Sequence, residues 1–233
     1  MGGNLYTRRM EEAYSTIFRQ CVSLNTELHK LVPLAKQMHL LSSNAVSSAA
    51  RAGSEGDAFR VLTQDIQLLG DDVSACIDDT QSIIDEIVRL ASNLARLFSN
   101  YIIYINLKTR LEDDRSAHSL ATKTTFFDGG QRLVAEEIKD NNHKMSRSLN
   151  KLTLLLSPIS ALVKKGEYLA VCSSVEAASA GEHGVSFEAV SSMLRELVGQ
   201  LGEQSSRQKA LLRDLSDSID QQQQNQGKLF YAR

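Results

Sequence analysis

The chain has 233 residues but only two prolines and no tryptophan. Proline removes a backbone donor and clashes inside a helix, so its scarcity favours long, uninterrupted helices. Basic and acidic residues nearly balance, with 26 Lys and Arg against 28 Asp and Glu, for a formal net charge of −2. A net charge so close to zero gives no excess of basic residues, which binding to nucleic acid would require. The composition therefore predicts an all-α protein that does not bind nucleic acid.

Cysteine is scarce as well, with Cys21, Cys76 and Cys172 as the three examples. An odd number of widely separated cysteines does not fit the disulfide framework of a small secreted protein. We expect reduced thiols packed as small core residues, in a cytoplasmic protein. The sequence also has no uncharged apolar stretch of about 18 residues, so we expect no insertion into a membrane.

The strongest positive signal is a heptad pattern. Apolar and small residues recur in alternating steps of four and three over positions 10–52, and again over 59–97. This spacing is typical of a left-handed coiled coil. Gly53 and Gly56, between the two runs, predict a tight turn near 53–56 with left-handed backbone at its glycines. Two heptad helices with so short a link fold back antiparallel, which predicts a helical hairpin over residues 1–112.

The second half repeats this organisation 128 residues later. Heptad runs flank a turn near 181–184, which contains Gly181 and Gly184, and they predict a second hairpin over 132–233. The two turns share alanines, glycines and a phenylalanine at fixed offsets: AAxAGxxGxxF in both halves. Such matches indicate an internal duplication.

Residues 113–131 are charged or polar for most of their length and end in Asp128-Gly129-Gly130, so they predict a linker with a turn at its end. A linker of about 20 residues spans at most roughly 70 Å when fully extended, so the second hairpin is expected to start beside the first. The predicted fold is a long antiparallel four-helix coiled-coil bundle made of two tandem hairpins in one chain. The two hairpins would replace a dimer, which predicts a monomeric pseudo-dimer.

The turn sequences resemble a known family. VEAASAGEHGVSFEAVSSMLREL (175–197) and, in a more divergent copy, NAVSSAARAGSEGDAFRVLTQDIQLL (44–69) are similar to the tip signature of methyl-accepting chemotaxis proteins, the bacterial chemoreceptors. In that family two chains each contribute one hairpin to a four-helix bundle. Its tip contacts a chemotaxis histidine kinase, its coupling protein and neighbouring receptor tips. The resemblance implies signal transduction by protein–protein contact. Heptad helices without a cleft offer no place to tune a catalytic acid, so we expect no enzymatic activity, and we expect no cofactor or metal.

The resemblance also implies which residues bind the partner. The first hairpin keeps the family asparagine and arginine, the second keeps two family glutamates and an arginine, and one further acidic residue lies in the first turn. The implied partner-binding residues are Asn44, Arg51, Glu55, Glu176, Glu182 and Arg195. Because the two halves retain different charges, we expect one polarised surface and one binding event per chain.

Two other functions remain open. One is a receptor-derived helical scaffold or adaptor that serves another partner without kinase control. The other is a histidine phosphotransfer bundle, because Ala117-His118-Ser119-Leu120 resembles the start of an A-H-x-L-K-G motif. Ala121 and Thr122 replace the lysine and glycine of that motif. The five histidines form no HxxH or HxxxH pair, which argues against a metal site.

Overall fold

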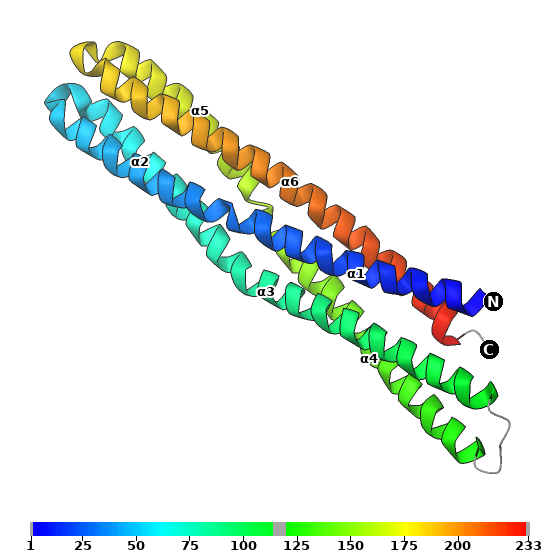
Figure 1. Ribbon diagram of the computed structural model, residues 1–233. Helices are drawn as coiled ribbons and strands as arrows, with labels where there is room; N and C mark the ends of the chain where they lie inside the picture. Colours follow the sequence, from blue (N-terminus) through cyan, green and yellow to red (C-terminus); the bar gives the residue numbers. More distant parts are fainter. Residues whose placement is uncertain (1, 114–119, 232–233) are drawn as a thin grey trace. The chain divides into compact units, whose positions relative to one another are not determined.

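The computed structural model describes residues 2–113 and 120–231, and nearly all of this part is helical (Figure 1). The elements are α1 (Gly2–His29), α2 (Leu31–Arg51), the 3₁₀ helix η1 (Gly53–Gly56), α3 (Asp57–Asp113), α4 (Leu120–Leu156), α5 (Ile159–Ser179), the 3₁₀ helix η2 (Gly181–His183) and α6 (Gly184–Tyr231). The described residues contain no β-strand. The predicted all-α class is confirmed.

The helices form two compact units, each of which contains segments from both halves of the sequence. Unit 1 comprises Met1–Ser23, Ile83–Lys151 and Leu211–Arg233, and unit 2 comprises Leu24–Ser82 and Leu152–Ala210. Both turns lie in unit 2, where α3 runs back along α2 and α6 runs back along α5 (Figure 1).

The predicted heptad positions account for most of the core. We call the line of heptad positions along each helix the seam. Every seam position of the first run is buried: Met10, Tyr14, Ile17, Cys21, Leu24, Leu28, Leu31, Ala35, Met38, Ser42, Ala45, Ala49 and Ala52. Val163, one of the predicted heptad positions, is half-buried. The prediction is shifted by one residue in three other places: Thr63 is buried instead of Leu62, Ser205 instead of Gln204, and Leu212 instead of Leu211. A helix with 3.6 residues per turn drifts against a strict seven-residue repeat, so the buried face can move to the neighbouring position.

The expectation of uninterrupted helices is wrong at both prolines. Lys30 separates α1 from α2, and Pro33 lies in the first turn of α2. Ser157 and Pro158 separate α4 from α5. Pro158 cannot donate to the Leu154 carbonyl, which accepts instead from the Ser157 backbone N–H at 3.2 Å and the Ser157 hydroxyl at 2.8 Å. The interruptions fall 128 residues apart although the two prolines do not.

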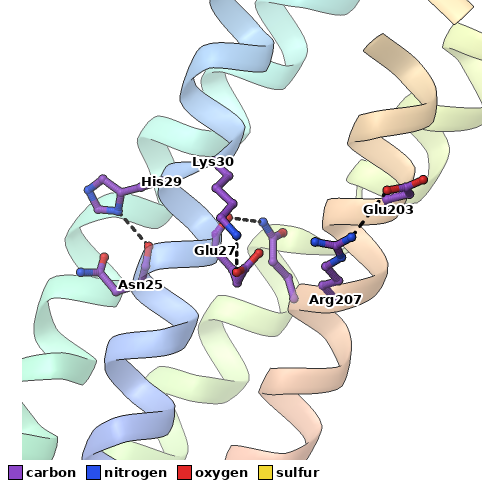
Figure 2. A network of polar contacts seen from close by, with 7 residues as sticks. Asn25, Glu27, His29, Lys30, Glu203 and Arg207 are labelled. Atoms are coloured by element: carbon purple, nitrogen blue, oxygen red, sulfur yellow. Dashed lines mark hydrogen bonds and ion pairs between the residues drawn. The ribbon is translucent and has the colours of Figure 1, made fainter. Parts of the chain in front are cut away.

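Each interruption leaves a backbone carbonyl that accepts from a side chain of the other sequence half. Gln208 Nε2 on α6 donates to the Glu27 carbonyl at 3.1 Å. Lys30 Nζ pairs with the Glu27 carboxylate at 2.5 Å, as Figure 2 shows. The Cys76 thiol on α3 donates to the Leu155 carbonyl at 3.1 Å. Positions 27 and 155 are equivalent in the duplication, so the two breaks are stabilised in the same way by chemically different donors.

The predicted linker is largely helical. α3 continues to Asp113, and α4 already begins at Leu120, so the turn expected at Asp128-Gly129-Gly130 is wrong. Contacts with α3 explain the difference. Lys108 Nζ pairs with Asp128 Oδ1 at 2.6 Å, and a Cβ on Gly130 would lie 2.9 Å from the Tyr104 ring. Close packing on α3 thus outweighs the cost of roughly 1 kcal/mol for glycine within a helix.

The glutamine-rich segment near the C-terminus is helical as well, because α6 extends to Tyr231. Gln223 Nε2 donates to the Asn142 carbonyl at 3.2 Å and to Ser146 Oγ at 2.9 Å. In the same region of unit 1, Asn142 Nδ2 donates to the Tyr14 hydroxyl at 2.9 Å. Polar side chains therefore hold this part of α6 against α4.

Candidate functional site

The two glycine turns have the same backbone geometry. Gly53 has a φ of 57° and Gly181 a φ of 52°, the only positive φ angles among the described residues. The expectation of left-handed backbone is wrong for Gly56 and Gly184, which are needed for a different reason. A Cβ on either would lie closer than 3.0 Å to the carbonyl oxygen seven residues earlier, on Ala49 or Ala177. In each turn, the first glycine is needed for its left-handed backbone, and the second allows the backbone to pass close to the preceding helix.

An aromatic stack joins the two turns. Phe59 and Phe187 each follow the second turn glycine by three residues, and both are buried. Their ring centroids are 3.9 Å apart, with an interplanar angle of 11°. The two turns therefore adjoin within unit 2, and we call the surface around them the tip: residues 40–68 and 168–196.

The implied partner-binding residues of the first hairpin are accessible. Asn44 and Arg51 are exposed on α2. The Arg51 guanidinium donates to Ser48 Oγ at 3.4 Å. This hydrogen bond is long and therefore weak, so a stronger acceptor on a partner could replace Ser48. Glu55 belongs to η1, and its side chain lies outside the described side chains.

The implied residues of the second hairpin have different surroundings. Glu182 is exposed in η2 and Glu176 is half-buried on α5. Arg195 on α6 donates to Ser174 Oγ at 3.0 Å. Ser174 in turn shares a 2.5 Å hydrogen bond with buried Ser191, whose hydroxyl donates to the Ala170 carbonyl. This chain of bonds orients Arg195 along the α5–α6 pair.

The structure reveals a feature of the tip that the sequence analysis missed. A groove of about 300 Å³ lies between the start of α3 and the end of α5. It is lined by Ala58, Val61, Leu62, Val171, Cys172, Val175 and Glu176, and we call it the α3/α5 groove. Val61, Val171 and Val175 are each more than half exposed. The sequence signal for this groove was the presence of valines at positions outside the buried seam.

Cys172 lies in this groove and departs from the expectation for the cysteines. Cys21 and Cys76 are buried, as expected, whereas Cys172 is half-buried. Burial raises the pKa of the Cys21 thiol to about 12. At the groove, a hydrogen bond with Cys172 is the main cause that raises the pKa of Tyr168, and the Asp65 carboxylate contributes in the same direction. Cys172 is therefore the thiol most accessible to reagents among the three.

The residue types that bind metal ions are scattered over the part of the chain that the structure describes. No group of three or more His, Cys, Asp or Glu side chains there lies close enough together to hold a metal ion. His39 Nδ1 lies 3.6 Å from Asp71 Oδ1, at an exposed position. His118, the residue of the phosphotransfer alternative, lies outside the described residues.

None of the described helices has both the length and the apolar character to cross a membrane.

Comparison with known proteins gave no matching family model, no matching curated protein and no matching solved structure.

Proposed function

We propose that the chain is a non-enzymatic, cytoplasmic signalling module whose two hairpins form a long antiparallel four-helix bundle. In this proposal one chain is a pseudo-dimer, and its tip binds a chemotaxis-type histidine kinase or the coupling protein of that kinase. The observation that carries the proposal is the stack of Phe59 on Phe187, which brings two turns with a chemoreceptor-like sequence to one surface.

The pairing of equivalent residues supports the pseudo-dimer. In an interface with twofold symmetry, residues at the axis contact their own equivalents. Phe59 meets Phe187 in unit 2, and Tyr14 meets Asn142 in unit 1, and both pairs are separated by 128 positions. Contacts of this kind are expected if the second hairpin takes the place that a second chain has in a symmetric dimer.

The distribution of exposed charge supports partner binding at the tip. Arg51 of the first hairpin and Glu182 of the second are both exposed. Exposed ion pairs contribute at most about 1 kcal/mol, but reversal of a charge that a partner desolvates costs about 2–5 kcal/mol. Side chains of this kind give a docking surface specificity without any catalytic group.

Titration calorimetry of the full chain with a chemotaxis-type coupling protein, and separately with the kinase, tests the function. Arg51→Glu and Glu182→Arg are each expected to weaken binding by about 2 kcal/mol or more. Arg89→Glu is the matched control, because Arg89 is exposed on α3 and lies in unit 1. One binding event per chain is expected. Absence of binding to both proteins, or indifference to both tip reversals, would contradict the proposal.

Sedimentation equilibrium tests the pseudo-dimer separately. A chain whose two hairpins replace a dimer is expected to remain at 25.7 kDa over the concentration range. An obligate dimer would show that each hairpin pairs with a second copy instead.

A further inference from the structure

The duplication creates two equivalent surfaces at the tip, and they differ in chemistry. The α3/α5 groove is one of them. Each lining residue has an equivalent 128 positions away in the other half of the sequence. These equivalents lie on α2 and α6, and we call the surface they form the α2/α6 counterpart. Five of the seven equivalent positions are polar: Ser43, Asn44, Ser47, Ser48 and Ser186. The other two are Ala189, which offers a single methyl group, and Val190, which is buried. The lining is therefore largely apolar in only one of the two equivalent surfaces.

Apolar side chains extend this groove along both helices. Val61 and Leu68 are exposed on α3 and lie seven residues apart. Tyr168, Val171 and Val175 are exposed on α5 at steps of three and four. This is heptad spacing on the outside of the helices, so one further helix could bury both rows as it would in a coiled coil. Seven residues correspond to about 10 Å of helix, so a partner helix of two to three turns covers the groove.

The charged residues beside the groove indicate which charge a partner should carry next to its apolar residues. Asp65 lies on α3 between Val61 and Leu68, and Glu176 is one of the residues that line the groove itself. Two other acidic residues beside the groove already have partners: Asp57 pairs with Arg60 at 2.6 Å, and Asp72 pairs with Lys165 at 3.5 Å. Lys164 lies one turn beyond Tyr168, at the end away from the turns. Near the turns the groove is therefore apolar with an acidic edge.

We propose that the α3/α5 groove, and not its α2/α6 counterpart, docks one amphipathic helix of a partner protein that carries Lys or Arg beside its apolar stripe. The inference rests on the proposed function for the identity of the partner, but not for the chemistry of the groove. A second copy of the chain fits less well, because two facing grooves would bring Asp65 and Glu176 of each copy toward like charges. Specialisation of one groove also gives one partner per chain, whereas a symmetric pair of grooves would give two.

A synthetic helical peptide tests the groove without any chemotaxis protein. The probe is a fluorescent 18-residue peptide with leucine at heptad positions a and d and lysine at e and g, and its comparison peptide has glutamate at e and g. Fluorescence anisotropy with the full chain should show one lysine peptide bound per chain, with the glutamate peptide at least ten-fold weaker. The bound peptide should also slow maleimide labelling of Cys172, which lines the groove.

Variants at equivalent positions of the two surfaces give matched controls. The double variant Val171→Ser and Val175→Ser places the counterpart's own residues, Ser43 and Ser47, in the groove and should weaken lysine-peptide binding at least ten-fold. Ser43→Ala with Ser47→Ala changes the equivalent, exposed positions of the counterpart and should change binding less than twofold. Circular dichroism with thermal melting checks that both variants fold. Glu176→Gln should reduce the preference for lysine over glutamate peptides.

Several outcomes would overturn the inference: two peptides per chain, equal losses from both double variants, equal binding of the two peptides, or a groove-dependent dimer in sedimentation. Failure of the proposed function would look different. If the peptide binds as expected while kinase and coupling protein do not, the groove is assigned and its partner is another protein. If a coupling protein binds in a manner sensitive to Arg51→Glu while the lysine peptide does not bind the groove, the function stands and the groove assignment is wrong.

Discussion

Phe59 and Phe187, 128 positions apart in the sequence, stack with ring centroids 3.9 Å apart. Both rings are almost completely buried. In unit 1 a second equivalent pair, Tyr14 and Asn142, meets through a hydrogen bond. The duplication is therefore visible in contacts as well as in sequence, because residues 128 positions apart touch within each unit.

The aromatic stack should be a major source of stability in unit 2. Phe59→Ala or Phe187→Ala is expected to lower the free energy of unfolding by about 3–5 kcal/mol, because each leaves a cavity in a buried layer. A double-mutant cycle should give a coupling of at least about 0.5–1.5 kcal/mol for the ring pair. Urea denaturation measures both. Val185→Ala, at a position 82% exposed, is the control and should change stability by less than about 0.5 kcal/mol.

The hydrogen bond in unit 1 should behave as a buried polar pair. Tyr14→Phe removes the acceptor of the Asn142 amide and should cost about 1–3 kcal/mol, because a buried donor loses its partner. Asn142 Oδ1 already lacks a partner, so Asn142→Leu combined with Tyr14→Phe should recover part or all of that loss. Chemical denaturation of the two single variants and the double variant checks this. Strictly additive losses would show that the two side chains do not interact.

The turn glycines can be tested against a glycine of the same chain. Gly56→Ala and Gly184→Ala place a methyl group against a backbone carbonyl and should destabilise the protein by about 1–3 kcal/mol each. Gly199→Ala is the matched control, since Gly199 lies within α6 and a Cβ there meets nothing within 4 Å. It should stabilise the protein by about 0.5–1 kcal/mol through helix propensity. Thermal melting followed by circular dichroism distinguishes the two signs.

Stability should fall in alkaline solution because of Cys21. In the unfolded chain this thiol ionises near its ordinary pKa of 9.0, whereas burial raises the native pKa to about 12. Between these values the unfolded state releases the proton first, so stability decreases by about 1.4 kcal/mol for each pH unit. The contribution is fully present below pH 9 and is lost as the pH approaches 12.

Urea denaturation at pH 8 and at pH 10 measures this dependence. The difference between the two stabilities should be smaller in Cys21→Ala than in the parent chain by about 1.4 kcal/mol. Comparison with this variant removes the contributions of other groups, such as Cys76 and Tyr101, whose pKa values burial also raises. Identical pH dependence in the two proteins would contradict the assignment to Cys21.

The sequence by itself determined the helical class, the positions of the two turns and the 128-residue duplication. Heptad spacing and turn glycines express the conformational preferences of nearby residues, so they can be read from a short window. For the same reason the buried seam was predicted correctly at almost every position, and most of its misses, such as Thr63 for Leu62, amount to a shift of one residue.

Tertiary structure decided what lies outside that seam. The Glu27 and Leu155 carbonyls find donors 181 and 79 residues away, on Gln208 and Cys76. The helix through Gly130 depends on packing against α3 in the same manner. At the tip, Val61, Val171 and Val175 form a groove only because α3 and α5 come from different hairpins and meet there. Local periodicity specifies which face of each helix is buried, but only the approach of distant segments determines which apolar side chains remain exposed together.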